Sequence, residues 1–401
     1  MSTPSHTDVR ARVLALVFFT VFLDMVGAGI VIPLLPFYVQ SMKGSAEVVG
    51  LILASFSGIQ MCATPVLGRL SDRYGRRPVI VISLAGNASA MLVFALGAQW
   101  AALPLLFASR MLAGATAGNL SACQAAVADV TDGAARAAGM GRVGAGIGLG
   151  LVVGPVLGSA LSHVHWSAPP LAAAVLAAAD CLAVYLWMPE TRIGGIGPVT
   201  SARSRALGQA LSDRRIVRVM AIYFLTFLCM TNLQVALPLF VHGQLDWGET
   251  EVGYVFGLYG LMALIVQGAF IGRISKRFGA VRALTMGACA AAGGMAMIAG
   301  AAHATPILLG VALTGLGVGV VNPMLASLAS EYAGPAQQGA VLGVAQSAGG
   351  LARTIGPVWS GVLFHRIAPV APFLFATTAA LVASGVAAGL GRRSTADHQR
   401  G

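Results

Sequence analysis

Long apolar runs recur along the whole chain, and they constrain the fold more than any other feature of the sequence. Each run is about 20 residues long or longer, which is the length that an α-helix needs to cross the roughly 30 Å hydrocarbon core of a bilayer. The pattern predicts an all-α membrane protein with twelve transmembrane helices. The runs are 13–38, 46–67, 78–98, 101–128, 138–161, 169–188, 217–241, 251–271, 282–301, 305–329, 338–364 and 369–390.

The composition indicates that the bilayer, rather than water, is the solvent for most of the chain. Hydrophobic residues make up 57% of the 401 residues and charged residues only 10%, whereas a soluble domain carries about a quarter charged residues. The longest segment between the runs is about 193–216, which leaves no room for a soluble catalytic domain. The first run contains Asp24 and has no small-residue cleavage site after it, so we interpret it as a retained helix rather than a signal peptide.

The 25 lysine and arginine residues are distributed unevenly between alternate loops. Assigning successive loops to opposite sides places 21 of them on one side and only Lys43 and Arg366 on the other, while Arg110 and Arg353 lie inside apolar runs. The positive-inside rule then predicts that both termini are cytoplasmic. The net charge of +11 is explained by basic loops on one side of the membrane. We therefore expect the chain to interact with the lipid bilayer and not with nucleic acid.

The sequence contains a repeat at an offset near 204 residues. Residues 68–75 read GRLSDRYG and residues 272–279 read GRISKRFG. We therefore predict an N-terminal six-helix half at 1–192, a cytoplasmic linker at 193–216 and a C-terminal six-helix half at 217–401. Two parallel-repeated halves are typical of transporters in which a binding site near the membrane midplane opens alternately to each side.

Three motifs in the first half resemble those of a known family. The segment 68–78 has the pattern G-x-x-x-D-x-x-G-R-R-P, Arg110 begins the second motif, and 150–158 has the pattern G-x-x-x-G-P-x-x-G. Together with Asp24, these motifs resemble the major facilitator superfamily, in particular its twelve-helix drug/proton antiporters of the tetracycline efflux type. The resemblance implies a major facilitator fold that exports small molecules in exchange for protons. It covers about 13–192 and, weakly, the second half.

The first motif has a physical rationale of its own. Its glycines permit a tight turn and a close helix approach, and Asp72 can pair with neighbouring arginines or face a helix N-terminus in the opposite half. The resemblance implies that this contact gates the transport cycle, although anchoring of the topology explains Arg76 and Arg77 equally well. The second half has Lys276 where the first has Asp72, so the predicted gate is asymmetric. The predicted gating loop comprises Gly68, Asp72, Arg73, Gly75, Arg76 and Arg77.

Glycines recur every four residues in the run at 138–161, starting at Gly146 and continuing through the third motif. This spacing places them on nearly one face of a helix, where a second helix can approach closely. Close packing alone explains the pattern. The resemblance adds that this is the antiporter motif, which is associated with exporters rather than importers, and its residues are Gly150, Gly154, Pro155 and Gly158.

Polar side chains inside the runs are the candidates for proton coupling and for a cargo cavity. An ionised side chain at the centre of a membrane helix costs about 2.5–3.5 kcal/mol unless it is paired or faces water. At about 1.5 Å per residue, Asp24 lies about 18 Å from one membrane face and Arg110 about 12 Å from the other. We therefore predict that these two residues share a depth and a cavity, with a purely structural ion pair as the alternative. The candidates are Asp24, Arg110, Asp180, Arg353, Asn232 and Gln234.

The roles predicted for the remaining candidates are less constrained. Since Asp24 has a cation at its depth, we predict that it carries the proton, while Asp180 affects cargo preference. A structural role is equally consistent with Asp180 and Arg353. The amides of Asn232 and Gln234 are explained equally well by interhelical hydrogen bonds and by a drug cavity.

Other functional classes lack support in the sequence. No nucleophile–base pair is evident, and two loop histidines, His163 and His165, are too few for a metal site, so we expect no enzyme, metal or cofactor. The tetracycline proteins carry acids in spans three and nine and a histidine in span eight, and this chain lacks all three, so their metal-chelate handling is not assumed. We predict a monomeric, proton-coupled exporter of an amphipathic drug, antibiotic or secondary metabolite in the cytoplasmic membrane. The alternative is a proton-coupled importer of a small nutrient.

Overall fold

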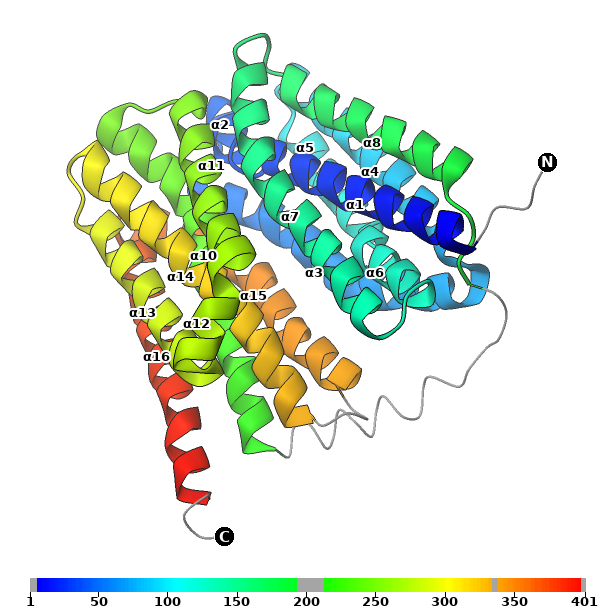
Figure 1. The fold of residues 1–401 in the computed structure, drawn as a ribbon. Coiled ribbons are helices and arrows are strands. Elements are labelled where there is room, and N and C mark those ends of the chain that lie inside the picture. Colours follow the sequence, from blue (N-terminus) through cyan, green and yellow to red (C-terminus); the bar gives the residue numbers. More distant parts are fainter. Residues whose placement is uncertain (1–5, 193–212, 334–337, 398–401) are drawn as a thin grey trace. The chain divides into compact units, whose positions relative to one another are not determined.

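A computed structural model describes residues 6–192, 213–333 and 338–397, and every regular element among these residues is helical (Figure 1). The elements in the N-terminal part are α1 (His6–Val31), α2 (Leu35–Ser41), α3 (Ala46–Tyr74), α4 (Arg76–Gln99), α5 (Leu103–Ala115), α6 (Asn119–Asp129), α7 (Gly133–Ser162) and α8 (Ala168–Trp187). Those in the C-terminal part are α10 (Arg214–Leu245), α11 (Glu249–Ile265), η1 (Val266–Phe270), α12 (Ile271–Phe278), α13 (Ala280–Ala299), α14 (Ala304–Ala333), α15 (Gln338–Arg366) and α16 (Ala371–Asp397). The all-α prediction is confirmed.

The twelve apolar runs correspond to single helices or to consecutive helices, although several helices extend three to seven residues beyond the end of their run. Ten helical stretches among the described residues are long and apolar enough to cross a membrane. The other two runs are α5 with α6, which a turn at 116–118 divides into two short helices, and α15, which contains Arg353 and several glycines.

Two breaks in the helices follow from the local sequence. The helix α1 ends just before Pro33, which has no N–H group to continue the backbone hydrogen-bond pattern, and α2 begins after a turn at 32–34. The turn at 116–118 includes Gly118 and ends α5, so that α6 starts at Asn119. This second break places the side chain of Asn119 deep in the protein, where it is only 5% exposed.

The chain divides into two compact units. Their boundaries cross two helices, because the start of α3 belongs to unit 2 and the start of α11 belongs to unit 1. The predicted division of the chain at 193–216 remains a prediction, since 193–212 lie outside the described residues. Unit 1 comprises 1–44, 55–196 and 248–257, and unit 2 comprises 45–54, 197–247 and 258–401.

Within unit 1, α1 lies between α7 and α8 (Figure 1). The apolar side chains of α1, α4, α6 and α8 form one buried cluster, which includes Val17, Ile80, Val127 and Val184. The helix α4 also packs against α5 and α8. Polar side chains on the faces of α1, α4, α6 and α8 that point toward this cluster are therefore buried among helices.

The glycine face of α7 packs directly against the backbone of α1, as the four-residue spacing predicts. A Cβ atom added at Gly154 would lie 2.7 Å from the carbonyl oxygen of Val26 and 2.8 Å from the Cα of Gly29. Gly150 and Gly158 face the backbone of α1 in the same way, one turn before and one turn after. This face of α7 is therefore a helix–helix contact and is not exposed to lipid.

Unit 2 has its own apolar core, formed mainly by α10, α13, α14, α15 and α16. Fully buried residues such as Ile222, Leu284 and Leu325 lie at its centre. The start of α3 packs on α15 in the same unit, where Nε of Arg366 donates to Oε1 of Glu47 over 2.7 Å.

Candidate functional site

Polar side chains from four helices meet inside unit 1, and we call this group the acidic cluster. Nδ2 of Asn87 donates a hydrogen bond of 3.3 Å to Oδ1 of Asp24. The amide of Asn119 is buried, and its Nδ2 has no hydrogen-bond partner among the described residues. Sγ of Cys123 donates to Oδ1 of Asn119 over 3.3 Å. The members of the cluster are Thr20 and Asp24 on α1, Asn87 on α4, Asn119 and Cys123 on α6, and Asp180 on α8.

Asp180 is the most enclosed acid of the acidic cluster. Its residue is 4% exposed, and Oγ1 of Thr20 donates to its Oδ1 over 3.0 Å. Its Oδ2 is buried and has no hydrogen-bond partner among the described residues. Thr20 and Asp24 are one helical turn apart on α1, so this hydrogen bond brings Asp180 to the face of α1 that also carries Asp24.

Asp24 and Arg110 do not form an ion pair in the structure, so the alternative of a purely structural pair has no support among the described residues. Arg110 is 6% exposed, and its Nη2 donates to Oγ of Ser109 over 3.2 Å and to Sδ of Met91 over 3.5 Å. Its guanidinium group also lies 5.1 Å from the ring centroid of Phe94. No ion pair of Arg110 occurs among the described residues, and its Nε has no hydrogen-bond partner there.

Helix geometry explains why the two side chains do not meet. Arg110 lies level with Met91 on α4, whereas Asp24 lies level with Asn87 on the same helix. These two positions on α4 are four residues, or about 6 Å, apart. Counting residues from the membrane faces also gives no information on the direction in which a side chain points.

A second polar group surrounds the predicted gating loop. Arg76 donates from Nη1 to Oδ1 of Asp72 over 2.7 Å and from Nε to Oδ2 of Asp129 over 2.9 Å. Nη1 of Arg192 donates to the same oxygen of Asp72 over 3.2 Å. The expectation that Asp72 pairs with neighbouring arginines therefore matches its contacts within unit 1, while Asp129 was missed by the sequence reasoning.

The backbone of the gating loop is held by one distant acid. The carboxylate of Glu190 accepts hydrogen bonds from the backbone N–H groups of Arg76, at 2.8 Å, and Arg77, at 3.2 Å. Gly75 has a φ of 108°, which favours glycine. At Gly68, in contrast, no neighbouring atom lies within 4 Å of a Cβ position, so its predicted close contact is not observed among the described residues.

The side chains of two further arginines in the gating loop lie against aromatic rings. The guanidinium group of Arg73 lies 5.3 Å from the ring centroid of Tyr74. That of Arg77 lies 5.4 Å from the ring of Tyr185, and its Nη2 also donates to the backbone carbonyl of Tyr185.

Replacing Arg76 with alanine is expected to destabilise unit 1. The substitution leaves Asp72 and Asp129 without their shared cation, and we expect a cost of about 2 kcal/mol, below the range for fully buried pairs because both acids are partly exposed. Thermal unfolding of the purified protein measures the effect. Arg73→Ala is the matched control, since Arg73 is exposed, and equal losses in both variants would contradict the structural role of Arg76.

Arg353, the arginine predicted to lie inside an apolar run of the second half, is on α15 in unit 2. The guanidinium group of Arg353 is 4.7 Å from the ring centroid of Phe227 on α10, and this ring is stacked on Tyr223 with centroids 6.3 Å apart. No ion pair of Arg353 occurs among the described residues. An unpaired guanidinium group in a membrane helix is costly unless it faces water or a ligand.

The two amides predicted to line a cavity lie on different faces of α10. Asn232 is fully buried, and its Nδ2 donates to the backbone carbonyl of Leu228 over 2.7 Å. Gln234 is half-buried and lies two residues further along the helix, where side chains point in a nearly opposite direction. The hydrogen bond of Asn232 therefore lies within its own helix, and no interhelical bond of its side chain occurs among the described residues. The structure also does not bring Asn232 together with Gln234.

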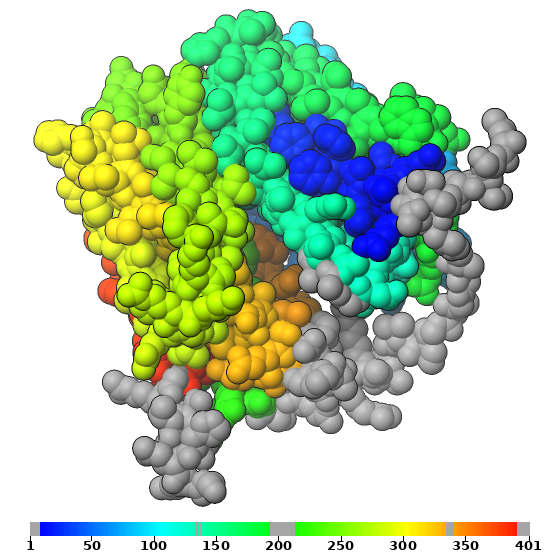
Figure 2. Space-filling view, viewed as in Figure 1, coloured from blue at the N-terminus to red at the C-terminus, as the bar shows by residue number. Residues whose placement is uncertain are grey.

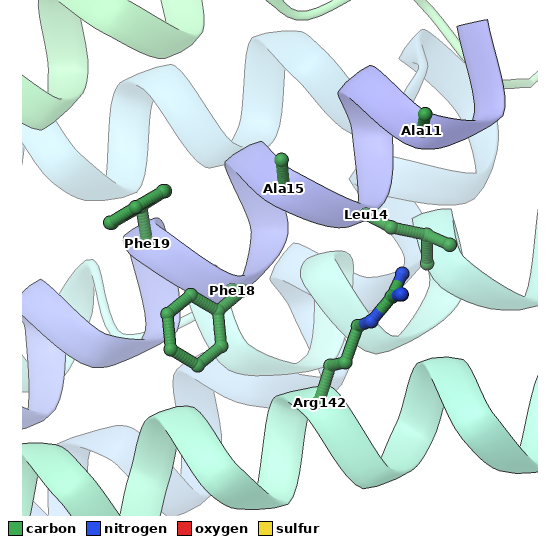
Figure 3. A pocket seen from close by; sticks show the side chains of 6 residues that line it. All are labelled: Ala11, Leu14, Ala15, Phe18, Phe19 and Arg142. Atoms are coloured by element: carbon green, nitrogen blue, oxygen red, sulfur yellow. The ribbon is translucent and has the colours of Figure 1, made fainter. Parts of the chain in front are cut away.

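A groove of about 420 Å³ lies between α1 and α7. Figure 3 shows Arg142 reaching from α7 toward α1, beside Leu14 and the ring of Phe18. In the space-filling view the surfaces of α1, in blue, and of α7, in blue-green, lie side by side (Figure 2). The acidic cluster is separate from this groove, and no group of three His, Cys, Asp or Glu side chains suited to a metal ion occurs among the described residues.

Comparison with known proteins identifies relatives that span most of the chain. The profile of the Major Facilitator Superfamily matches residues 17–357 and 219–399. The Escherichia coli tetracycline resistance protein, class C, is 34% identical over 315 residues, which cover 76% of this chain and 79% of that protein. Major facilitator superfamily domain-containing protein 10 from Bos taurus is 32% identical over 407 residues, which cover 87% of this chain and 86% of that protein.

A solved structure extends the similarity to three dimensions. The crystal structure of the human organic anion transporter MFSD10 has a TM-score of 0.72 to this chain at 27% sequence identity. The similarity covers 94% of this chain and 99% of the transporter.

Proposed function

Because the chain belongs to the major facilitator superfamily, a family of membrane transporters, we propose that it is a proton-coupled exporter of amphipathic small molecules. Its fold is that of the family, with twelve membrane-spanning helices in two six-helix halves. Transport then follows from alternating access, in which a site between the halves opens to one side of the membrane at a time.

The observation that carries the proton coupling is the carboxyl group of Asp24 in the middle of a membrane helix. It accepts a hydrogen bond from the amide of Asn87, and no cation is paired with it among the described residues. A carboxylate in such a site is costly when it is charged, and binding a proton removes the charge. A change in its access to water during the cycle therefore changes its occupancy by a proton, which is what coupling requires.

Two features favour export over import. One relative is a tetracycline resistance protein, and the antiporter motif of α7 forms the contact with the helix that carries Asp24. A shift of α1 along this glycine face would alter the surroundings of Asp24 directly. Import of a small nutrient together with protons is the alternative, and the sign of the proton movement distinguishes the two.

The gating loop is proposed to hold one closed state of the cycle. Arg76 connects the ends of α3, α4 and α6 through Asp72 and Asp129. These partners stabilise a single arrangement of the three helix ends, so separating them has a free-energy cost that the proton or the cargo must offset.

An amphipathic organic anion is a second candidate for the cargo. The observation that favours it is Arg353, whose guanidinium group lies against Phe227 without an acid paired to it among the described residues. A cation beside an aromatic ring suits a ligand with an acidic group and an apolar body. A relative of known structure is described as an organic anion transporter.

The proposed location is the cytoplasmic membrane, with both termini in the cytoplasm. The prediction rests on the 21 basic residues assigned to one side of the membrane. A reporter enzyme that works only in the cytoplasm should be active when fused after Gly401 and inactive when inserted beside Lys43. The reverse pattern would contradict the topology, and equal activity at both sites would contradict the number of spans.

Accumulation of cargo in intact cells tests the proposed function. Cells that produce the protein should retain less tetracycline, or less of a fluorescent organic anion, than cells without it. Collapse of the proton gradient with an uncoupler should abolish this difference. Higher retention in the producing cells would instead indicate import.

A further inference from the structure

The acidic cluster contains two carboxyl groups but no basic residue. Asp24 lies on α1 and Asp180 on α8, and Thr20, one helical turn before Asp24, donates a hydrogen bond to Asp180. The remaining acids of the chain lie at or near helix ends or in loops. A single proton-carrying aspartate requires only Asp24, so it does not explain why unit 1 encloses a second carboxyl group at Asp180.

The two carboxyl groups differ in their burial. Asp24 is half-buried and accepts a hydrogen bond from Nδ2 of Asn87. Asp180 is buried, accepts a hydrogen bond from Thr20 at Oδ1, and has no partner for its buried Oδ2 among the described residues. A carboxylate is more costly to leave charged where it is more deeply buried and one of its oxygens has no donor.

No basic side chain among the described residues forms an ion pair with Asp180. Within its surroundings, α1 contributes Thr20 and Asp24, α4 contributes Asn87, and α6 contributes Asn119 and Cys123. On α8 itself the neighbouring titratable group is the thiol of Cys181. The arginine at position 110 is engaged with its own neighbours on α4 and α5. Two like charges that share an enclosed site do not both ionise readily, so a proton is retained by one of them.

We propose that Asp24 and Asp180 bind protons as one unit, in which Oδ2 of Asp180 keeps its proton while Asp24 gains and loses a second one. The inference rests on the proposed proton-coupled transport. It assigns the reversible binding of the transported proton to the pair of Asp24 and Asp180. With Asp180 neutral, the pair alternates between a single negative charge and no charge, and the doubly charged state is avoided. Asp180 then acts on the proton site and not on cargo preference, which revises the role predicted for it from the sequence.

Thr20 is the positioning residue of this unit. Its hydroxyl group donates to Oδ1 of Asp180 over 3.0 Å, which marks Oδ1 as the carbonyl oxygen of the neutral acid and Oδ2 as the oxygen that holds the proton. Since Thr20 and Asp24 lie on the same face of α1, a movement of this helix alters the hydrogen bond to Asp180 and the surroundings of Asp24 together.

Infrared spectroscopy of the full-length protein in lipid tests the proposal, because a protonated carboxylic acid has a C=O stretching band that a carboxylate lacks. At neutral pH the wild-type protein should show this band. Asp180→Asn should remove it, and Asp24→Asn should retain it. A folded wild-type protein without the band, or a band lost only in Asp24→Asn, would overturn the proposal.

A milder variant keeps the test decisive if Asp180→Asn does not fold. Thr20→Val preserves the shape of the side chain but removes the donor, so the C=O band should move to higher frequency. Thr314→Val is the matched control, because Thr314 is also buried and its hydroxyl group bonds within its own helix in unit 2. An unchanged band in Thr20→Val would contradict the assignment of Oδ1.

The infrared result is independent of transport. If the wild-type protein moves cargo without protons, the proposed function fails even where the band behaves as expected. If proton-coupled transport is present and the band is absent, this inference fails and the proposed function stands.

Discussion

Replacing Asp24 with asparagine is expected to abolish proton-driven export and to leave the protein folded. Asparagine has nearly the same shape and still accepts the hydrogen bond from Asn87, but it cannot bind or release a proton. Export by Asp24→Asn should therefore fall to the level of membranes without the protein, while equilibrium binding of cargo persists. The measurement is uptake of tetracycline or an organic anion into inside-out membrane vesicles, with and without a proton gradient.

A matched control separates loss of coupling from a general effect of removing an acid. Asp246→Asn removes a carboxyl group from the end of α10, where φ is 53° and asparagine is well tolerated. This variant should export at the wild-type rate. Coupled export by Asp24→Asn would show that another group carries the transported proton and would remove the main support for the proposed mechanism.

Replacing Gly154 with leucine is expected to cause the largest loss of stability. The added Cβ atom would meet the backbone of Val26 and Gly29 at 2.7–2.8 Å, and backbone atoms in a packed helix have no free space into which to move. Overpacking typically costs about 1–3 kcal/mol, and we expect at least the upper end of this range here. Thermal unfolding in detergent and transport at equal protein levels measure the two consequences.

Gly144→Leu is the control for this substitution. Gly144 lies on the same helix, but no neighbouring atom lies within 4 Å of its Cβ position. The control should unfold and transport like the wild type. If Gly154→Leu retained wild-type stability and transport, the close contact of α7 with α1 would be unnecessary, and the antiporter motif would have no role in this chain.

The sequence predicts the helices of this protein well because the bilayer sets their minimum length. The run at 46–67 lies within α3, and that at 138–161 lies within α7, although α3 continues to Tyr74, beyond its apolar run. The four-residue glycine spacing also identifies a packing face correctly, since residues at this spacing stay on one side of any α-helix. Features that depend on a single helix are therefore accessible from the sequence.

Features that depend on two or more helices are less accessible. Asp24 accepts a hydrogen bond from Asn87, which lies on a helix whose rotation about its axis the apolar pattern does not specify. Arg110 lies about one helical turn along α4 from the level of Asp24 and among different neighbours. The depth of a residue follows from counting along one helix. Whether two side chains meet also depends on how their two helices are rotated relative to each other.

The positions of two acids that contact the gating loop can be predicted from the sequence. Asp129 and Glu190 are 53 and 114 residues from Arg76, but both follow apolar runs that end on the same side of the membrane as the loop. An acid that follows such a run lies near the loop and can pair with a buried arginine. The ends of the apolar runs therefore indicate Asp129 and Glu190 as candidate partners of Arg76.

Proton movement in reconstituted liposomes tests the central claim most directly. Purified protein is placed in liposomes with an acidic lumen that contains a pH-sensitive dye, and the cargo identified by the cell assay is added outside. Antiport predicts that cargo accumulates in the lumen while the lumenal pH rises, and that Asp24→Asn shows neither change. Entry of cargo with a fall in lumenal pH would indicate symport, and entry with no pH change in the wild-type protein would contradict proton coupling altogether.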